Sequence, residues 1–436
     1  MEWGVILTVS ITVLLALFAT GVPIFVAFLV VNVGGTFILF GPSGFGMFSN
    51  SFYNTITQET LMAIPLFVLM GEILFRSNAV EILIDAIDKM VGNIRGRHYI
   101  LVTTLSTVFG ALSGSAVAVA AMLGRSVLPV MEERGYDKRL SVGAVIGGAS
   151  LAPIIPPSLL VIMVGSMVDV SIAKLLIAGI LPGLLLAVMM IVYTYIRVLR
   201  DPTLEPPRKE ASENKLSPKE LLIAFIQTLP FLIVIFSVMG LIMLGVATPN
   251  ESAATGVLGA LVASAIFRKL SLKMVIQSIL GTCSISAMIL IIIACSMFFG
   301  QLLTFTGATT GLVGMASDLG LSSLWTFVVL MLIPFGLCMF VDLFAVMLIA
   351  IPIYEPLLDV YGYDPVWFWM LFLINMTLGA MTPPFGYTIF ALKGAAPEFS
   401  MEDVYAGTWP MVGIFVLGMV IMYIFPSIVT FLPSMF

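Results

Sequence analysis

The sequence predicts an all-α polytopic membrane protein, and three observations carry the prediction. Hydrophobic residues make up 60% of the 436 residues and charged residues only 10%, whereas soluble domains carry about 25% charged residues. Mean hydropathy is +1.14. Apolar runs of about twenty residues, long enough to cross a bilayer as helices, recur throughout the chain. This composition excludes a soluble enzyme, a nucleic-acid-binding protein and a disordered protein. The apolar runs also lack the alternation of apolar and polar residues, over about ten positions, that the strands of a transmembrane β-barrel need.

The predicted spans fall into two halves, residues 1–199 and 220–436, on either side of a polar linker at 200–219. The linker carries four prolines among mixed charges and is expected to be exposed in the cytoplasm. With about 10–12 transmembrane helices expected in all, the clearest spans are 4–19, 21–38, 59–76, 140–168 and 173–199, then 220–244, 250–267, 275–299, 365–392 and 405–431.

The start of the chain leaves one choice open. Residues 4–38 form either one tilted helix or two, and Gly21-Val22-Pro23 favours a break. The first apolar run follows Met-Glu-Trp-Gly without a basic segment, so no cleavable signal peptide is expected.

Two apolar segments, 99–131 and 322–357, are too long for one span and are interrupted near the middle. Two short limbs joined by a polar turn predict a re-entrant hairpin, which enters and leaves on one side of the membrane. Such irregular backbone is tolerated at membrane depth only inside protein or beside a water-filled cavity. The interruptions are Ser113-Gly114-Ser115 and Cys338–Asp342, and the expected closing residues are Pro129 and Pro352.

Positive charge predicts that the two hairpins enter from opposite sides. Sixteen of the 19 Lys and Arg residues fall in four patches, which should be cytoplasmic. The first hairpin lies between two of these patches, whereas the second is flanked by acidic residues. Opposed hairpins in two halves are typical of an inverted repeat. The patches are 76–97, 134–139, 197–219 and 268–273. Segments 78–93 and 301–318 are expected to be interfacial helices on the two sides.

Matching Pro-Pro pairs support the repeat. Residues 152–158 and 380–386 each place such a pair inside an otherwise good span, after a hairpin. Proline there removes backbone donors and leaves carbonyl oxygens free. Free carbonyl oxygens suit Na⁺, and the positive N-terminus of a broken helix suits a carboxylate. The structural alternative is that the Ser, Thr and Gly residues at the turns and breaks serve only close helix packing.

The candidate residues follow from the hairpin turns and the breaks. The first Na⁺ site would use Ser113, Gly114, Ser115, Gly148, Ser150 and Pro153. The second would use Cys338, Asp342, Asn375, Thr377 and Gly379. Substrate would lie near Ser115, Arg125, Pro156, Pro157, Thr382, Pro383 and Pro384.

Two charged candidates have structural alternatives. An acid inside the membrane tends to mark an ion path, but Asp342 also suits a cap on the second hairpin limb. Arg125 would attract an anionic substrate or extend to the cytoplasmic surface. The chain has three separated cysteines and one histidine, His98, so neither a metal cluster nor a cofactor is expected.

These motifs together resemble the large membrane subunit of the tripartite ATP-independent periplasmic (TRAP) transporters, in order and over nearly the whole chain. The matching stretches are Ala63–Phe67 with Gly71, Ser113–Ala116, Gly135–Asp137, Ile155–Ser158, Pro182-Gly183, Thr248-Pro249 with Glu251–Ala253, Asp342 and Thr382–Gly386. The chain departs from the usual pattern at Cys338, commonly glycine, and at Asn250, commonly threonine.

The resemblance implies a function. Such proteins lie in the cytoplasmic (inner) membrane of bacteria or archaea and import organic acids, driven by Na⁺. A periplasmic binding protein delivers the substrate, and a small four-helix membrane subunit braces the large one, which works as an elevator. The resemblance implies that one set of Na⁺ ligands comes from the Ser113–Ser115 turn and residues 147–153. The other set comes from the turn before Asp342 and residues 377–381, so Met381 joins the candidates for the second site.

Two other classes stay open from the sequence. A stand-alone Na⁺- or H⁺-coupled carboxylate carrier would share the hairpins but need no binding protein. A membrane-embedded enzyme would have to rely on Asp342, because no nucleophile–base pair or metal cluster is visible. The sequence names neither the acid carried nor the number of Na⁺ ions.

Overall fold

The computed structural model describes residues 2–77, 86, 89, 95–206 and 218–436, and the regular structure in these residues is helical throughout. The predicted fold class is therefore confirmed. Six described segments are long and apolar enough to cross a membrane, and shorter apolar helices add to them. The six are Ile24–Ile56, Ile172–Arg200, Lys219–Met243, Leu272–Phe305, Leu343–Tyr361 and Met401–Ile424.

The N-terminal segment is two helices, α1 (Trp3–Ala19) and α2 (Ile24–Phe40), so the predicted break is present. Gly21 makes it with a φ of +77°, which residues with a Cβ rarely adopt. The next helix, α3 (Gly44–Ile56), was not among the predicted spans, and α4 (Ala63–Arg76) follows it.

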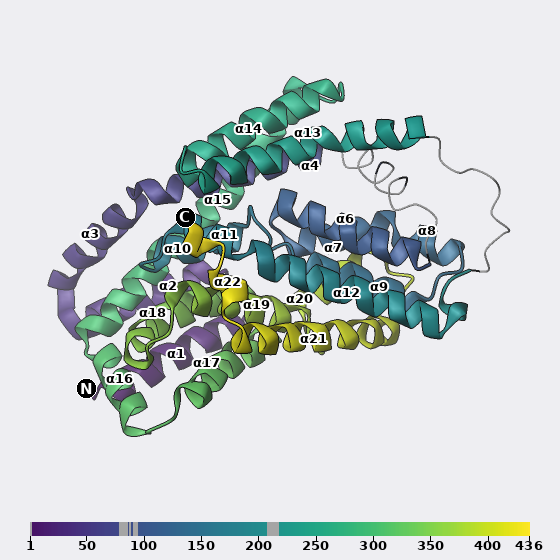
Figure 1. The fold of residues 1–436 in the computed structure, drawn as a ribbon. Helices are drawn as coiled ribbons and strands as arrows, with labels where there is room; N and C mark the ends of the chain where they lie inside the picture. The colour runs from purple at the N-terminus through teal and green to yellow at the C-terminus, as the bar shows by residue number, and fades with distance from the viewer. Residues whose placement is uncertain (1, 78–85, 87–88, 90–94, 207–217) are drawn as a thin grey trace.

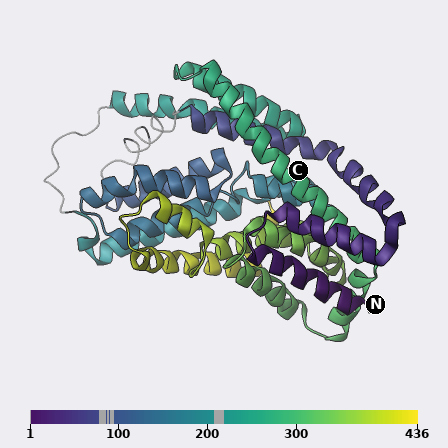
Figure 2. The same ribbon diagram turned by 180° about the vertical axis from the view of Figure 1, so that it is seen from behind.

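One group of helices forms a layer along the edge of the molecule (Figure 1). It comprises α4, α13 (Pro218–Met243), α14 (Pro249–Ile266) and the long α15 (Leu272–Phe305), in which α4 contacts α14 and α15, and α14 contacts α13. Seen from behind, α15 crosses the molecule diagonally (Figure 2). It thereby also contacts α2, α3 and the second hairpin. We call α4 and α13–α15 the outer layer.

The first hairpin has the predicted form. Helix α6 (Arg97–Ser113) runs to a turn at Gly114 and Ser115, and α7 (Ala116–Ser126) returns beside it before the short α8 (Leu128–Glu133). Gly114 has a φ of +62°, which ends α6 in the left-handed region where glycine is favoured.

The second hairpin corrects one prediction. Helices α17 (Ser323–Cys338) and α18 (Leu343–Tyr361) flank the expected turn, but Pro352 lies inside α18 and does not close it. Proline at 352 cannot donate to the Leu348 carbonyl four residues earlier. The Ser296 hydroxyl on α15 donates to that carbonyl at 2.6 Å instead. A neighbouring helix thus supplies the missing donor, and α18 continues.

Each half also contains a helix broken at its Pro-Pro pair. Helix α9 (Lys138–Ala149) ends before residues 150–158, and α10 (Leu159–Met167) follows. Helix α19 (Pro365–Met381) ends before residues 382–386, and α20 (Tyr387–Ala395) follows. Both Pro-Pro peptide bonds are cis. The remaining helices include α11 (Ile172–Ala178), α12 (Ile180–Arg200), α16 (Ala308–Asp318), α21 (Met401–Ile424) and α22 (Ser427–Thr430).

Three predicted segments are either largely outside the described residues or divided in the structure. The interfacial helix at 78–93 lies almost entirely outside the described residues, as does 207–217 of the linker. The expected interfacial segment 301–318 is divided, because residues up to Phe305 belong to α15 and a separate α16 begins at Ala308. Gly307, with a φ of +71°, makes the turn between them.

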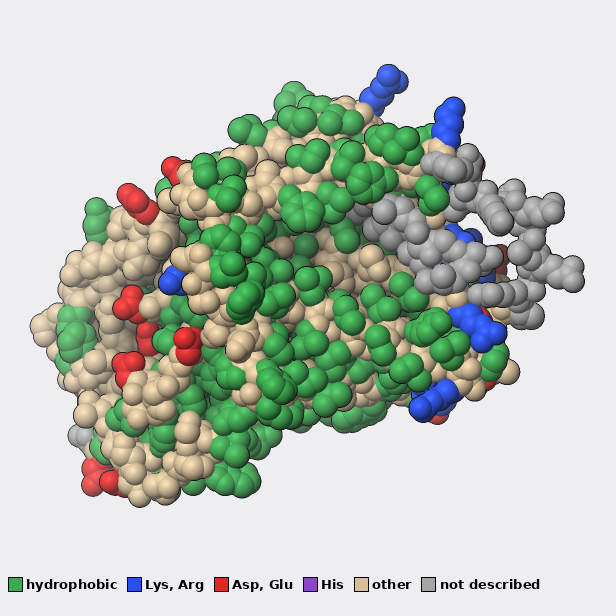
Figure 3. All heavy atoms as spheres, viewed as in Figure 1, with side chains coloured by type: hydrophobic (Ala, Val, Ile, Leu, Met, Phe, Trp, Pro, Cys, Tyr) green, Lys and Arg blue, Asp and Glu red, His purple; other side chains and the backbone are tan. Residues whose placement is uncertain are grey.

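Charge is distributed unevenly over the surface. In Figure 3, Lys and Arg gather mainly at the end beside α6–α8 and the start of α13, while Asp and Glu are prominent at the opposite end. The positive-inside rule predicts such a separation of basic and acidic ends if the basic end is cytoplasmic. The opposed entry of the hairpins stays a prediction.

Single cysteines test that prediction. Glu133 at the end of α8 and Asp359 near the end of α18 are both exposed. In a chain whose three natural cysteines are replaced, Glu133→Cys should react with an impermeant maleimide only from the cytoplasmic face, and Asp359→Cys only from the other. Reaction of both from the same face would contradict the inverted repeat.

Candidate functional site

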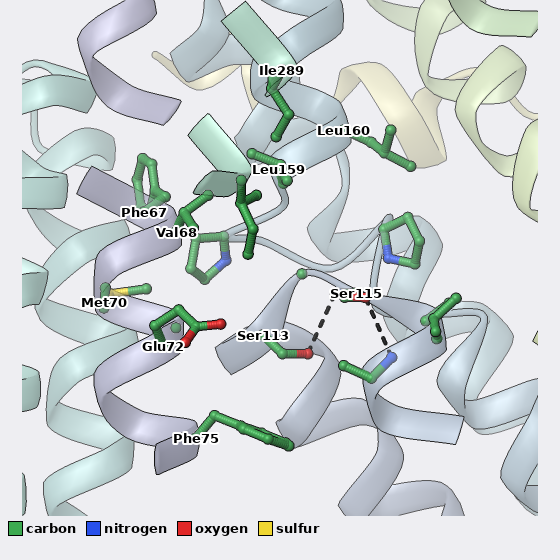
Figure 4. A pocket seen from close by; sticks show the side chains of 18 of the residues that line it. Phe67, Val68, Met70, Glu72, Phe75, Ser113, Ser115, Leu159, Leu160 and Ile289 are labelled. Atoms are coloured by element: carbon green, nitrogen blue, oxygen red, sulfur yellow. Dashed lines mark hydrogen bonds between the residues drawn. The ribbon is translucent and has the colours of Figure 1, made fainter. Parts of the chain in front are cut away.

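A cavity of about 310 Å³ lies where the first hairpin turn meets the outer layer. Its walls come from α4 and α15 on one side, and from the first turn and first break on the other (Figure 4). Phe344 at the start of α18 and Tyr387 at the start of α20 also line it, so both halves contribute. Ligand pockets for small molecules begin at about this size.

Hydrogen bonds shape the first turn. The Ser113 Oγ accepts from the Ser115 amide at 3.3 Å, and the Ser115 Oγ accepts from the Ala118 amide at 3.3 Å. Ser115 is therefore the N-cap of α7. A Cβ at Gly114 would lie 3.2 Å from the Leu159 amide, so the turn packs directly on the first break. Ser113, Gly114, Ser115 and Pro153 all line the cavity.

At the first break, two of the candidate oxygens already have partners. The Ser150 hydroxyl donates to the Ile146 carbonyl at 2.9 Å, and the Pro153 carbonyl accepts from the Ser158 hydroxyl at 2.5 Å. No donor among the described residues hydrogen-bonds the backbone carbonyls of Ser150 and Ala152. The break therefore has free backbone carbonyls, as expected from the sequence.

Gly148 holds the first limb of the hairpin close to α9. A Cβ at Gly148 would lie 2.4 Å from the Cβ of Ser106 on α6, far inside normal contact. The position therefore acts through close packing, the alternative that the sequence left open, as well as through any carbonyl it offers.

The second break has a similar contact. A Cβ at Gly379 would lie 2.6 Å from the Cβ of Cys338, so α19 and the end of α17 touch through glycine. The Cys338 Sγ also lies 3.5 Å from the sulfur of Met376. The structure thus brings Cys338 and Gly379 together, and it buries Met381 completely.

The polar side chains of α19 and of its C-cap residue donate hydrogen bonds to backbone carbonyls of α19 and α17. Thr377 and Thr382 donate to the carbonyls of Ile374 and Leu378, at 2.8 and 2.6 Å. Asn375 donates to the Met331 carbonyl at 2.7 Å. Met331 lies seven residues before Cys338 on α17, or about 10 Å along the helix. Asn375 therefore sits away from the second turn.

Asp342 is the N-cap of α18, and its Oδ1 accepts from the Phe344 amide at 2.9 Å. The capping interpretation is thus present in the structure. The rings of Phe340 and Phe385 lie 5.5 Å apart, so the second turn packs on the second break.

The substrate candidates divide into two sets. Ser115 and Pro157 line the cavity, whereas Pro156, Thr382 and Pro383 are buried outside its lining. Pro384 is exposed, and its carbonyl accepts from the Tyr405 hydroxyl at 2.7 Å. Arg125 is exposed in the last turn of α7, about 15 Å along that helix from Ser115.

Glu72 lines the cavity from α4 and was not among the residues predicted from the sequence. Its carboxylate pairs with Arg76 on the next turn of the helix. Glu72 is an acid within the predicted span 59–76. An acid inside the membrane tends to mark an ion path, and this signal, used for Asp342, also applies to Glu72. Several aromatic lining residues, Phe67, Phe75 and Tyr387, gave no distinctive sequence signal.

Comparisons with known proteins agree on one family. The family model described as "Tripartite ATP-independent periplasmic transporter, DctM component" matches residues 11–428. The ectoine/5-hydroxyectoine TRAP transporter large permease UehC of Ruegeria pomeroyi is 31% identical over 87% of each chain. The C4-dicarboxylate TRAP large permease DctM of Pseudomonas aeruginosa is 30% identical over 92% of each.

A solved structure is similar in fold. The YdaH transporter of Alcanivorax borkumensis superposes with a TM-score of 0.57 at 16% identity, over 88% of this chain and 89% of the other. At that identity the likeness concerns the fold alone.

Proposed function

The chain belongs to the DctM family of TRAP transporters, and from this membership we propose that it imports an organic acid, driven by a Na⁺ gradient. Its relatives are transporter permeases and not enzymes, and the chain is a multi-pass protein of the bacterial inner membrane. The observation that carries the proposal is the cavity shared by the first hairpin turn, the first break and residues from both halves.

The substrate would lie in this cavity with a carboxylate at the first turn. The Ser113 and Ser115 hydroxyls and the amides at the start of α7 offer hydrogen-bond donors there. A helix N-terminus also carries partial positive charge, which favours an anion. Related permeases are named for C4-dicarboxylate, ectoine and 2,3-diketo-L-gulonate.

Na⁺ would bind at the two places where a hairpin turn meets a break. The free carbonyls of the first break and the carboxylate of Asp342 offer oxygen ligands, as Na⁺ requires. The tight contacts of Gly148 with Ser106 and of Gly379 with Cys338 pack each hairpin limb closely against the broken helix of its half. Ion binding would therefore stabilise the arrangement that also forms the substrate cavity.

The position of the cavity favours an elevator mechanism. One wall belongs to the outer layer, and the opposite wall belongs to the hairpin and the broken helix. Helix α20 packs on α7, so the second half supports the first hairpin. The hairpins and broken helices would slide together against the outer layer, carrying the occupied turn across the membrane.

A periplasmic binding protein and a small membrane subunit would complete the transporter, as the word tripartite in the family description suggests. The second candidate function is a stand-alone Na⁺- or H⁺-coupled carboxylate carrier. Uptake by the purified chain without a binding protein would favour that alternative.

Na⁺ dependence tests the proposal. The chain should be reconstituted in proteoliposomes with its small subunit and binding protein, and a panel of organic acids offered with Na⁺, H⁺ or K⁺ gradients. Uptake should require inward Na⁺ and proceed without ATP. Uptake at full rate in Na⁺-free vesicles would contradict the coupling.

A further inference from the structure

The described lining of the cavity contains one charged side chain. Glu72 is the one carboxylate among its described lining residues, which include neither Lys nor Arg. The remaining polar groups are hydroxyls and backbone amides. A substrate with two carboxylates would therefore place one of them in a confined space near a protein carboxylate, without a lysine or arginine in the lining.

Glu72 is held in place by its neighbours. Its side chain is 19% exposed, and one oxygen, Oε2, pairs with the Arg76 Nε. A Cβ at Gly281 on α15 would lie 2.9 Å from that same oxygen, so α15 closes over the pair. A larger residue at this position would require the Glu72 carboxylate to shift.

Arg76 pairs with Glu72 from outside the cavity lining. Its side chain is 38% exposed and is absent from the lining, so the guanidinium lies on the outer side of the pair. Figure 4 shows the carboxylate of Glu72 directed toward Ser113 across the cavity. A ligand bound at the first turn would therefore face Glu72.

A cationic group is the natural partner for this position. It would donate a charge-assisted hydrogen bond to Glu72, which is about twice as strong as a neutral one. Phe67 and Phe75 on the same helix also line the cavity, and aromatic faces attract cations. A second carboxylate at the same place would gain neither contact.

We propose that this cavity selects organic acids that also carry a cationic group, such as an ammonium or amidinium. The carboxylate lies at the Ser113–Ser115 turn and the cation at Glu72. The inference rests on the proposed function only in placing the substrate in this cavity. It makes Glu72 a specificity-determining residue on α4.

Matched pairs of ligands test the proposal on the purified permease with its small subunit, so that the binding protein's own selectivity does not enter. Each pair shares one carboxylate and differs at the other end: γ-aminobutyrate and succinate, 6-aminohexanoate and adipate, and 4-(aminomethyl)cyclohexanecarboxylate and cyclohexane-1,4-dicarboxylate. The midpoint of thermal unfolding is titrated with each ligand at saturating Na⁺, since bound ligand raises it. In at least one pair the zwitterion should bind roughly tenfold more tightly.

Variants assign the effect to Glu72. Glu72→Gln should reduce that affinity ratio by about tenfold. If the single variant folds poorly because Arg76 has lost its partner, the double variant Glu72→Gln/Arg76→Gln leaves no unpaired guanidinium. It should reduce the affinity ratio by the same factor. Glu59→Gln removes an exposed carboxylate before α4 and should leave the ratio unchanged. An unchanged ratio in both Glu72 variants, or no preference for a zwitterion in any pair, would overturn the inference.

The outcome is separable from the Na⁺ coupling. Repeating the wild-type titrations without Na⁺ measures the coupling independently of the affinity ratio. Zwitterion preference that persists without Na⁺ linkage would reject the coupling and keep the role of Glu72. Na⁺ linkage without the preference would do the reverse.

Discussion

Asp342→Asn should lower the apparent Na⁺ affinity of uptake by about tenfold or more, because losing about 1.4 kcal/mol of binding changes an affinity by a factor of ten. Asp342 caps α18 with one oxygen, and Asn keeps that hydrogen bond. The substitution therefore removes charge while preserving shape. The measurement is the Na⁺ dependence of uptake at matched expression.

The matched control is Asp364→Asn. Asp364 also caps a helix of the second half, accepting from the Trp367 amide at 2.8 Å, but it is exposed at the start of α19. Its substitution should leave the Na⁺ curve unchanged. If Asp342→Asn behaves like Asp364→Asn, then Asp342 is only a cap and does not belong to the ion site.

Gly148→Ala should impair both stability and transport. The new methyl group would lie 2.4 Å from the Cβ of Ser106, so α6 must move away from α9. Overpacking of this kind costs about 1–3 kcal/mol. Because α6 leads into the Ser113–Ser115 turn, we expect the thermal midpoint to fall and Na⁺ affinity to drop roughly tenfold.

Two controls isolate the contact. Gly413→Ala, on α21 with no atom near the new Cβ, should be neutral or slightly stabilising. Ser106→Gly removes the clashing atom, so combining it with Gly148→Ala should restore uptake. It costs about 1 kcal/mol by itself, because glycine is unfavourable inside a helix. A double variant as impaired as Gly148→Ala would show that the defect arises elsewhere.

The two turns and two breaks were predictable because local residues determine them. Gly114 adopts a backbone conformation that favours glycine, Ser115 caps the following helix, and the Pro-Pro pairs deprive two helices of donors. These effects act within a few residues of sequence. The break in 4–38, which the sequence favoured but left open, rests on the same kind of signal at Gly21.

The failures involve partners far away in sequence. Pro352 would end α18 in isolation, but Ser296 satisfies the carbonyl that the proline leaves free. Asn375 stays a predicted ion ligand, but the hydrogen bond from its amide to the Met331 carbonyl on another helix was not predictable from local sequence. Glu72 faces the hairpin turn only because α4, α15 and the hairpin pack around one cavity. Such contacts depend on tertiary packing, which no local pattern specifies.

The most direct test of the account is the accessibility of the cavity from the two sides of the membrane. Val117 lines the cavity beside the first turn, so Val117→Cys in a cysteine-free chain reports on it. An impermeant thiol reagent should label this cysteine in proteoliposomes when added on either side, and Na⁺ with a transported acid should slow labelling on both. Labelling from one side only, unaffected by Na⁺ and substrate, would contradict a cavity that carries substrate across the membrane.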